Sequence, residues 1–262
     1  MSPILFEFGP IRIATYGVML AIGFLCGLWI LRRELMHRNL DRDLADRIVF
    51  AAMIGGVIGG KVFHLMEYPA IFWADPLGTV FSGYGLAWYG GFLGGAAAVL
   101  WTVRRHNALD WATLDAIAPA LAVGYFFGRG GCELSGDGCY GVLTDMPWGK
   151  AYPNGAVPTL DHVHPTPIYE MLQMVCIFGI LWSLRDRLKS GMLFGVYLIL
   201  MAIARFSVEF VRRTPEVLLG LTVHQWVSMG LVLVGVYVIY HRYTAEEAVV
   251  VSKSDAILES ES

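Results

Sequence analysis

The chain has 262 residues, of which 56% are hydrophobic and only 16% are charged. This apolar share lies outside the range of soluble globular proteins and predicts a membrane protein. The net charge of −3 excludes the strongly basic balance expected of a nucleic-acid-binding protein, so no nucleic-acid partner is expected.

Seven apolar segments of about 17 to 22 residues are each long enough to cross a hydrocarbon layer about 30 Å thick. We therefore predict an all-α polytopic membrane protein with seven transmembrane helices. No long linker divides the chain, so residues 1–243 are expected to form a single membrane domain. The expected spans are about 13–31, 47–66, 85–103, 112–128, 167–184, 191–210 and 222–241.

Positive charge is distributed unevenly between these segments. Twelve of the 19 Lys and Arg residues follow the first, third, fifth and seventh spans. Because positive residues mark the cytoplasmic face, we expect the N-terminus outside and the C-terminus in the cytoplasm. The last residues, 244–262, are acidic and Ser-rich, and we expect this tail to be disordered.

The glycine repeats "GGVIGG" at 55–60 and "GGFLGG" at 90–95 lie in or near the second and third spans. Glycines four residues apart expose backbone on one helix face and allow a second helix to approach closely. Neither repeat is followed by Lys-Ser or Lys-Thr, which a phosphate-binding loop would require. Close helix packing is therefore the expected role.

The longest polar connection, about 129–166, joins the fourth and fifth spans and is expected on the outer side of the membrane. It opens with "GRGGCELSGDGCYG" at 128–141, which is expected to be a flexible loop, and continues with Pro, Asn, Gly and aromatic residues. We predict a folded cap on the outer leaflet. Trp148, Tyr152 and Tyr169 are expected at the level of the lipid headgroups, where amphipathic rings settle.

Arg205 and Glu209 are charged residues within the sixth span and share one helix face. A charge at the centre of a span costs roughly 2.5–3.5 kcal/mol, so the pair predicts either a structural ion pair or a functional polar site. Arg129, Lys61 and Arg212 add cations near the same level. Each alone is typical of a helix-end anchor, but together they predict a site for an anionic phospholipid headgroup.

The four cysteines fall into two pairs. Cys26 and Cys176 lie within spans, where buried, inert thiols are expected. Cys132 and Cys139 lie in the outer connection, where we expect a disulfide, with two free thiols as the alternative. Ligand spacing typical of zinc is lacking between this pair and the neighbouring histidines, so no metal is expected. His164 is expected to order the turn before the fifth span.

Five motifs resemble the prolipoprotein diacylglyceryl transferase family in type and in order, over about residues 10–240. They are "YGVML", "YGGFLGG", "GRGGCELSGDGCYG", "VHPTPIYE" and "RFSVEFVR". The resemblance implies a multi-pass protein of the bacterial inner membrane that uses no cofactor. It also implies transfer of the diacylglyceryl group of phosphatidylglycerol to the lipobox cysteine thiol of preprolipoproteins, which forms a thioether.

The same resemblance implies roles for individual residues. Arg129 matches the family's phosphatidylglycerol-binding arginine, and Arg205 with Glu209 matches its essential pair. The implied catalytic residues are Arg205, Glu209, Tyr89 and Tyr16, and the implied phosphatidylglycerol-binding residues are Arg129, Arg205, Tyr169, Gly90 and Gly91.

The chain departs from the family pattern in two places. Tyr89 stands where the best-known members have a histidine proposed as the general base, and tyrosine, with a pKa of about 10, is a poor base at neutral pH. Cys132 and Glu133 replace an asparagine and an aromatic residue of many members. Either Glu209 or another group accepts the proton, or the chain is a divergent member that binds or modifies phospholipid without this activity.

A small-molecule transporter is a further alternative, since transporters also carry charges within their spans. Their sites usually lie near the midplane and often on interrupted helices. The charges of this chain gather toward one leaflet, which favours a lipid-modifying enzyme.

Overall fold

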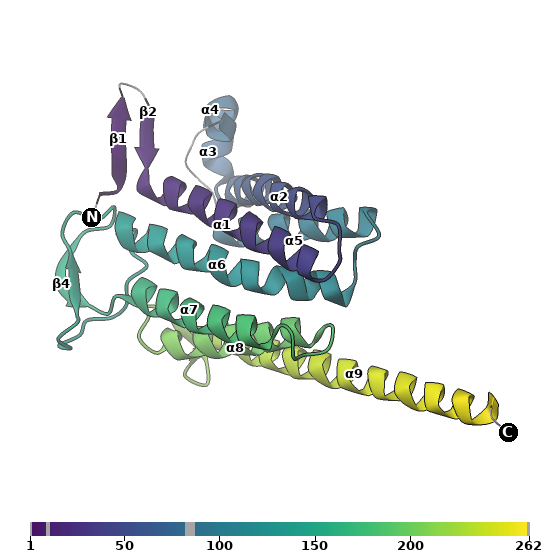
Figure 1. The fold of residues 1–262 in the computed structure, drawn as a ribbon. Helices are drawn as coiled ribbons and strands as arrows, with labels where there is room; N and C mark the ends of the chain where they lie inside the picture. Colours follow the sequence, from purple (N-terminus) through teal and green to yellow (C-terminus); the bar gives the residue numbers. More distant parts are fainter. Residues whose placement is uncertain (1, 9–10, 82–86, 261–262) are drawn as a thin grey trace. The chain divides into compact units, whose positions relative to one another are not determined.

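The computed structural model describes residues 2–8, 11–81 and 87–260, drawn as a ribbon in Figure 1. The chain forms two compact units. The first contains Met1–Ile30 and Leu114–Ser262, and the second contains Leu31–Thr113.

Among the described residues, six helices are long and apolar enough to cross a membrane. They match six of the seven predicted spans and show a polytopic, predominantly α-helical membrane protein. These helices are α1 (Thr15–His37), α2 (Asp43–Glu67), α6 (Trp111–Ser135), α7 (Thr166–Leu184), α8 (Met192–Glu209) and α9 (Val223–Ser260), the last with its apolar part at Val223–Ala245.

The remaining predicted span, about 85–103, falls mainly on α5 (Trp88–Arg105). This helix is not one of the six candidate spans, because its 18 residues include two arginines and four glycines, which lower its hydropathy. Residues 85–86 of the predicted segment lie outside the described part of the chain.

Large apolar side chains lie exposed along these helices. Leu25 and Trp29 of α1, Phe50 of α2, Leu172 of α7 and Leu233 of α9 are each at least 60% exposed. A soluble protein rarely exposes apolar surface on this scale, whereas a lipid environment requires it. The hydrophobic surface therefore agrees with the membrane location.

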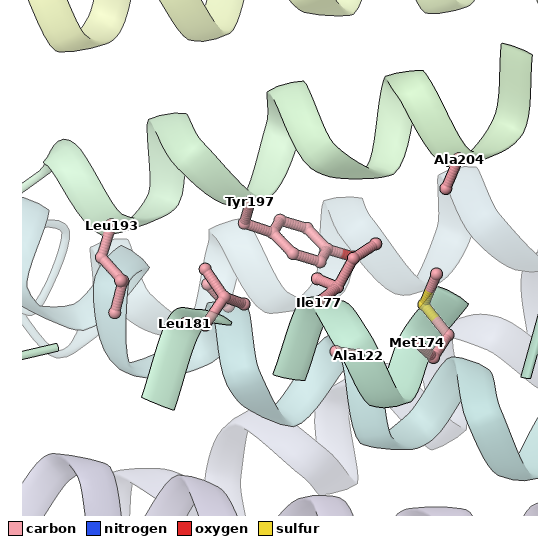
Figure 2. Packing of buried hydrophobic residues seen from close by; sticks show 8 residues of the cluster. Ala122, Met174, Ile177, Leu181, Leu193, Tyr197 and Ala204 are labelled. Carbon is pink, nitrogen blue, oxygen red and sulfur yellow. The ribbon is translucent and has the colours of Figure 1, made fainter. Parts of the chain in front are cut away.

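The core of the first unit lies where α6, α7 and α8 meet. Figure 2 shows Tyr197 of α8 directed toward Ile177 of α7, with Leu181 and Leu193 beside them. Asp115 of α6 fixes the start of α8, because its carboxylate accepts the backbone N–H groups of Gly191 and Phe194 at 2.7 and 2.8 Å. These contacts hold the three helices that carry the candidate site.

Helix α6 is longer than the sequence predicts. It continues to Ser135, so Arg129 and the glycines after it are helical, and the connection to α7 begins at Gly136 rather than at 129. Glycine is a weak helix former, but packing overrides this preference. A Cβ atom on Gly130 would lie 2.8 Å from Met19 Cε, and one on Gly131 would lie 2.9 Å from Tyr16 Cδ2.

The connection from Gly136 to Pro165 is folded, as predicted. Strands β3 (Lys150–Tyr152) and β4 (Thr159–Val163) form an antiparallel hairpin. The ring of Tyr140 stacks on the ring of Tyr152, with 4.9 Å between centroids. Tyr152 is fully buried, so its ring packs inside the protein and does not contact lipid, and its level in the membrane stays a prediction.

Glu133 joins the hairpin of this connection to the end of α6. Its carboxylate accepts a hydrogen bond from the Tyr152 hydroxyl at 2.8 Å and pairs with Lys150 Nζ at 2.5 Å. Burial and this hydrogen bond raise the pKa of Tyr152, so its hydroxyl remains a donor at neutral pH.

Two further hairpins complete the first unit. Strands β1 (Ile4–Phe8) and β2 (Ile11–Ala14) pair antiparallel before α1. Strands β5 (Glu216–Leu218) and β6 (Leu221–Thr222) pair between α8 and α9, where Leu219 and Gly220 adopt positive φ angles.

Helix α9 continues to Ser260 through the segment for which the sequence predicts disorder. The backbone from residue 244 to Ser260 is therefore helical in the structure. The predicted domain boundary at residue 243 stays a prediction.

In the second unit, α2 and α5 pack through the two glycine repeats, which confirms the predicted role. A Cβ atom on Gly59 would lie 2.3 Å from the carbonyl oxygen of Gly90, and one on Gly94 would lie 2.4 Å from that of Gly55. We call these four residues the glycine interface. The short helices α3 (Pro69–Ala74) and α4 (Pro76–Phe81) follow α2.

Candidate active site

Three arginines from separate parts of the first unit meet at one carboxylate. Arg129 Nε of α6 lies 3.0 Å from Glu170 Oε2 of α7. Arg205 Nη1 of α8 lies 3.3 Å from Glu170 Oε1, and Arg212 Nη1, just after α8, lies 3.3 Å from Oε2. We call Arg129, Arg205 and Arg212 the arginine cluster. Its formation confirms that cations of the fourth and sixth predicted spans converge.

Tyr125 extends the contacts around Glu170. Its hydroxyl donates to Glu170 Oε1 at 2.9 Å and accepts a hydrogen bond from Arg129 Nη2 at 2.9 Å. Tyr125 and Arg129 are four residues apart on α6, so one helix face presents both groups. This second contact fixes the orientation of the Arg129 guanidinium.

Glu209 orients Arg205 from the opposite side. Arg205 Nη2 lies 2.5 Å from Glu209 Oε2 within the same helix. The other carboxylate oxygen of Glu209 accepts a hydrogen bond from Thr222 Oγ1 at 3.1 Å and lies 3.3 Å from His224 Nδ1. The side chain of Glu209 is fully enclosed and holds one edge of the Arg205 guanidinium.

The spacing of Arg205, Glu209 and Arg212 along the chain places their side chains on the same side of α8 and of the residues that follow it. Arg205, Glu209 and Arg212 are separated by four and then three residues, which is close to two turns of an α-helix. Arg205 and Arg212 can therefore both reach Glu170 on α7, while Glu209 lies between them in the sequence.

The cluster carries an excess of positive charge. Three guanidinium groups and the two carboxylates of Glu170 and Glu209 give 3 − 2 = +1. The arginine side chains are 16–19% exposed, whereas the two carboxylates are 2% exposed or less. Each guanidinium has five N–H donors, and Glu170 binds only some of the donors of each arginine. The accessible side of the cluster is therefore cationic and suits a singly charged anion with several acceptor oxygens.

Tyr16 and Tyr169 lie near the cluster without joining it. Tyr16 packs against α6 at Gly131, two residues beyond Arg129. The hydroxyl of Tyr169 lies 3.0 Å from His164 Nδ1 and accepts a hydrogen bond from Trp148 Nε1 at 2.7 Å. The contact with His164 agrees with its predicted role in ordering this turn.

Tyr89, Gly90 and Gly91 lie at the start of α5, in the second unit, as does Lys61 on α2. Tyr89 is half exposed. Gly90 belongs to the glycine interface, because a Cβ atom there would lie 2.3 Å both from the Gly59 carbonyl oxygen and from Phe63 Cβ. Close packing alone therefore requires glycine at position 90.

Sequence reasoning missed Glu170, which the structure places at the centre of the cluster. It noted this residue only as the last letter of "VHPTPIYE". An available signal was its location near the start of a span, where a carboxylate is costly unless it is paired. Tyr125, Thr222 and His224 have ordinary residue types for their positions and carry no comparable signal.

All four cysteines are free thiols in the structure, so the expected disulfide is not formed. Cys132 and Cys139 are nevertheless close, and each offers a sulfur atom within 4.8 Å of the other and of an Asp137 carboxylate oxygen. A hydrogen bond from the Cys132 thiol lowers the pKa of Cys139. Cys176 on α7 is expected to be buried, but its side chain is exposed.

Comparison with known proteins gives a consistent result. The family profile described as "Prolipoprotein diacylglyceryl transferase" matches residues 3–241. A relative from Clostridium tetani is 32% identical over 241 residues, which cover 91% of this chain and 96% of the relative. A relative from Chromohalobacter salexigens is 34% identical over 238 residues, which cover 89% and 87% of the two chains. Both relatives are named phosphatidylglycerol--prolipoprotein diacylglyceryl transferase.

Proposed function

The chain belongs to the prolipoprotein diacylglyceryl transferase family, and we propose that its arginine cluster holds the phosphate of phosphatidylglycerol during the reaction. The protein is a transferase that moves the diacylglyceryl group of this lipid to a prolipoprotein. The acceptor on the prolipoprotein is the lipobox cysteine thiol, and the product is a thioether.

The observation that carries this proposal is the meeting of Arg129, Arg205 and Arg212 at the buried Glu170. Phosphatidylglycerol has one phosphodiester group with one negative charge, which matches the +1 excess of the cluster. A guanidinium group can donate two parallel hydrogen bonds to two oxygens of one phosphate, and it remains positively charged at physiological pH.

The same groups suit the bond changes of the reaction. The substrate sulfur forms a bond to the glyceryl carbon while the bond from this carbon to the phosphate oxygen breaks. The leaving glycerol phosphate then carries one more negative charge than the phosphodiester, and the thiol proton passes to a base. Guanidinium groups placed in advance around the phosphate stabilise this growing charge, an effect worth about 3–4 kcal/mol per donor in comparable sites.

Glu170 and Glu209 act in this proposal as positioning residues. Glu170 holds one edge of each arginine, and Glu209 holds the second edge of Arg205. On the resemblance alone, Tyr16 is proposed as a catalytic residue and Tyr169 as a residue that binds the lipid headgroup near the cluster. Tyr89 is proposed as a catalytic hydrogen-bonding group and Gly90 with Gly91 as lipid-binding residues, on the resemblance alone.

The proposed membrane topology rests on the charge distribution. We propose that α5 is a seventh span, that the N-terminus and the connection from Gly136 to Pro165 lie outside, and that the C-terminus lies in the cytoplasm of a bacterial cell, in its inner membrane. The support is the positive charge after the first, third, fifth and seventh predicted spans.

Reporter fusions test this topology. An alkaline phosphatase joined after Gly155 should be active, because this enzyme folds only in an oxidising compartment, and the same enzyme joined after Ala245 should be inactive. The reverse pattern of activity would invert the proposed orientation.

The direct test of the function uses purified protein, phosphatidylglycerol in mixed micelles and a peptide with a lipobox cysteine. The wild type should transfer the diacylglyceryl group, and Arg129→Ala or Arg205→Ala should lower the rate by about 100- to 1,000-fold. Arg185→Ala is a matched control, because Arg185 stacks on Trp182 at the other end of α7.

Two outcomes would contradict the proposal. Wild-type protein that binds phosphatidylglycerol but never lipidates the peptide would favour a divergent, lipid-binding member. Arginine variants that keep full activity would place the phosphate elsewhere. Rescue of a transferase-deficient strain by the wild type, and not by Arg205→Ala, would support the same function in cells.

A further inference from the structure

A second group of reactive side chains lies outside the arginine cluster, at the end of α6. Cys132, Asp137 and Cys139 each offer one sulfur or carboxylate oxygen atom, and these atoms all lie within 4.8 Å of one another. Cys132 is buried and the other two residues are half-buried. We call these residues the dithiol–carboxylate group.

The backbone of this segment is shaped to bring the three side chains together. Gly136 and Gly138 adopt φ angles of 58° and 88°, which other residues rarely adopt. They turn the chain directly after α6, so that Asp137 and Cys139 return toward Cys132. Gly136 is held by the hairpin, because its carbonyl oxygen accepts the Val157 N–H at 2.9 Å.

Hydrogen bonds fix the group from both sides. Asp137 Oδ1 accepts the backbone N–H of Cys139 at 3.1 Å, which sets the direction of the carboxylate. The carbonyl oxygen of Cys139 accepts a hydrogen bond from Thr166 Oγ1 at 2.6 Å, which ties the turn to α7. The donors are therefore held in place by the fold, as a metal site requires.

The chemistry of the donors points to a cation. Two sulfur atoms and one carboxylate oxygen within 4.8 Å of one another are close enough to contact a single ion. Zinc binds sulfur and carboxylate ligands. Magnesium and calcium prefer oxygen ligands, so two sulfur donors disfavour them.

We propose that Cys132, Asp137 and Cys139 form a binding site for zinc or a similar thiophilic divalent ion. Three protein ligands leave one position of a tetrahedral ion available for water or another ligand, which is the arrangement of open rather than structural zinc sites. The site uses none of the residues of the arginine cluster, and its occupancy does not depend on the proposed function.

The position of the site is defined by two helices. Cys132 follows Arg129 by three residues on α6, and Thr166 precedes Glu170 by four residues on α7. Each separation is about one helical turn, or roughly 5.4 Å along the axis. The ion would therefore lie about one turn beyond the arginine cluster, toward the folded connection.

The test is metal binding by the purified full-length chain under reducing conditions. Cobalt(II) added to the apo-protein should produce thiolate-to-metal absorption with a stoichiometry of one ion per chain, and zinc should displace it. Cys132→Ser and Cys139→Ser should abolish this absorption. Asp137→Asn should weaken zinc binding at least about ten-fold, the lower end of effects seen when a metal site loses a tuning group.

The control is Cys176→Ser, which removes an exposed thiol on α7 and should leave metal binding unchanged. The amide introduced by Asp137→Asn keeps an oxygen that can accept the Cys139 N–H, so this variant tests the donor with little change to the turn. Retained thermal stability of each apo-variant shows that a loss of metal binding is not a loss of folding.

Absence of thiolate-to-metal absorption in the reduced wild type would overturn the proposal. It would also be overturned if the protein, isolated without reductant, had two fewer reactive thiols than the reduced form and the reduced form bound no ion, because the pair would then be a disulfide. Equal zinc affinity for the wild type and Cys139→Ser would contradict it as well. A chain that binds the ion but does not lipidate a peptide would leave this site intact and contradict only the proposed function.

Discussion

The arginine cluster and the glycine interface bring helices together by opposite means. In the first, α6, α7 and α8 present charged side chains that meet at Glu170. In the second, glycines of α2 and α5 face each other, and the backbone atoms of Gly59 and Gly90 approach directly. Charges within a membrane are costly and are retained for chemistry, whereas glycine contacts are a common means of association in lipid.

This difference shows that residues of one family pattern can serve unlike purposes. Arg129 is aimed at a shared polar centre, while Gly90 is required by the helix beside it. Substitutions in the arginine cluster should therefore reduce activity more than folding, and substitutions in the glycine interface should reduce folding first. Substitution of Glu170, which contacts all three arginines, should reduce both activity and folding.

The largest effect is expected from Glu170→Gln. The change keeps the shape of the side chain but leaves three arginines without their common anion. We expect the free energy of unfolding to fall by about 3–5 kcal/mol and transfer to become undetectable. Thermal unfolding in detergent and the peptide assay measure the two effects.

Glu7→Gln is the control for this prediction, since Glu7 pairs with Arg12 at an exposed position. Exposed pairs contribute about 0–1 kcal/mol, so stability and activity should hardly change. If Glu170→Gln unfolded at the wild-type temperature, the carboxylate would not be what holds the arginines.

A smaller effect on stability is expected from Gly90→Ala. The new Cβ would lie 2.3 Å from the Gly59 carbonyl oxygen, so α2 and α5 must separate. Overpacking of this kind costs about 1–3 kcal/mol, and we expect the upper end. Differential scanning calorimetry in detergent gives the change in melting temperature.

Gly91→Ala is the matched comparison, because a Cβ there would lie 3.3 Å from the Gly56 carbonyl oxygen and needs only a small adjustment. It should unfold close to the wild-type temperature. If instead both variants kept wild-type stability and lost activity, lipid binding rather than helix packing would be the role of these glycines.

The smallest effect is expected from Tyr152→Phe, which removes the hydroxyl that donates to Glu133 at 2.8 Å. A hydrogen bond to a charged group contributes about 1.5 kcal/mol, so stability should fall by roughly that amount while transfer continues. Chemical denaturation of the two proteins provides the measurement.

The pH dependence of this difference follows from the raised pKa of Tyr152. Because the folded state favours the protonated hydroxyl, the contribution is fully present below the usual tyrosine pKa of about 10 and is lost only as the pH rises beyond it. The difference between wild type and Tyr152→Phe should thus be constant between about pH 6 and about pH 9. A difference that disappeared within this range would show that the hydroxyl is not the donor.

Much of the helix pattern could be predicted, because hydropathy is a local property that each segment carries by itself. The six candidate spans match predicted segments to within a few residues at most ends. The end of α6 could not be predicted, because its glycines are weak helix formers and their close packing against Met19 and Tyr16 is a tertiary contact. Such contacts join residues far apart in the chain and leave no periodic signal.

Only the part of the candidate site that lies on a single helix could be predicted from the sequence. Arg205 and Glu209 are four residues apart on one helix, so their pairing can be read from spacing. Glu170 lies on another helix, and no local pattern indicates that it binds Arg129, Arg205 and Arg212.

The amino-acid sequence by itself determined the apolar spans, the asymmetry of positive charge and the family, since each depends on residue type and order alone. Only the tertiary structure decided that Glu170 is the centre of the arginine cluster, that Gly90 is needed for packing and that Asp137 joins the two thiols. These three facts depend on which side chains meet after helices distant in the chain have packed, and a pair of distant residues acquires an interaction energy only when the fold brings them within a few ångströms.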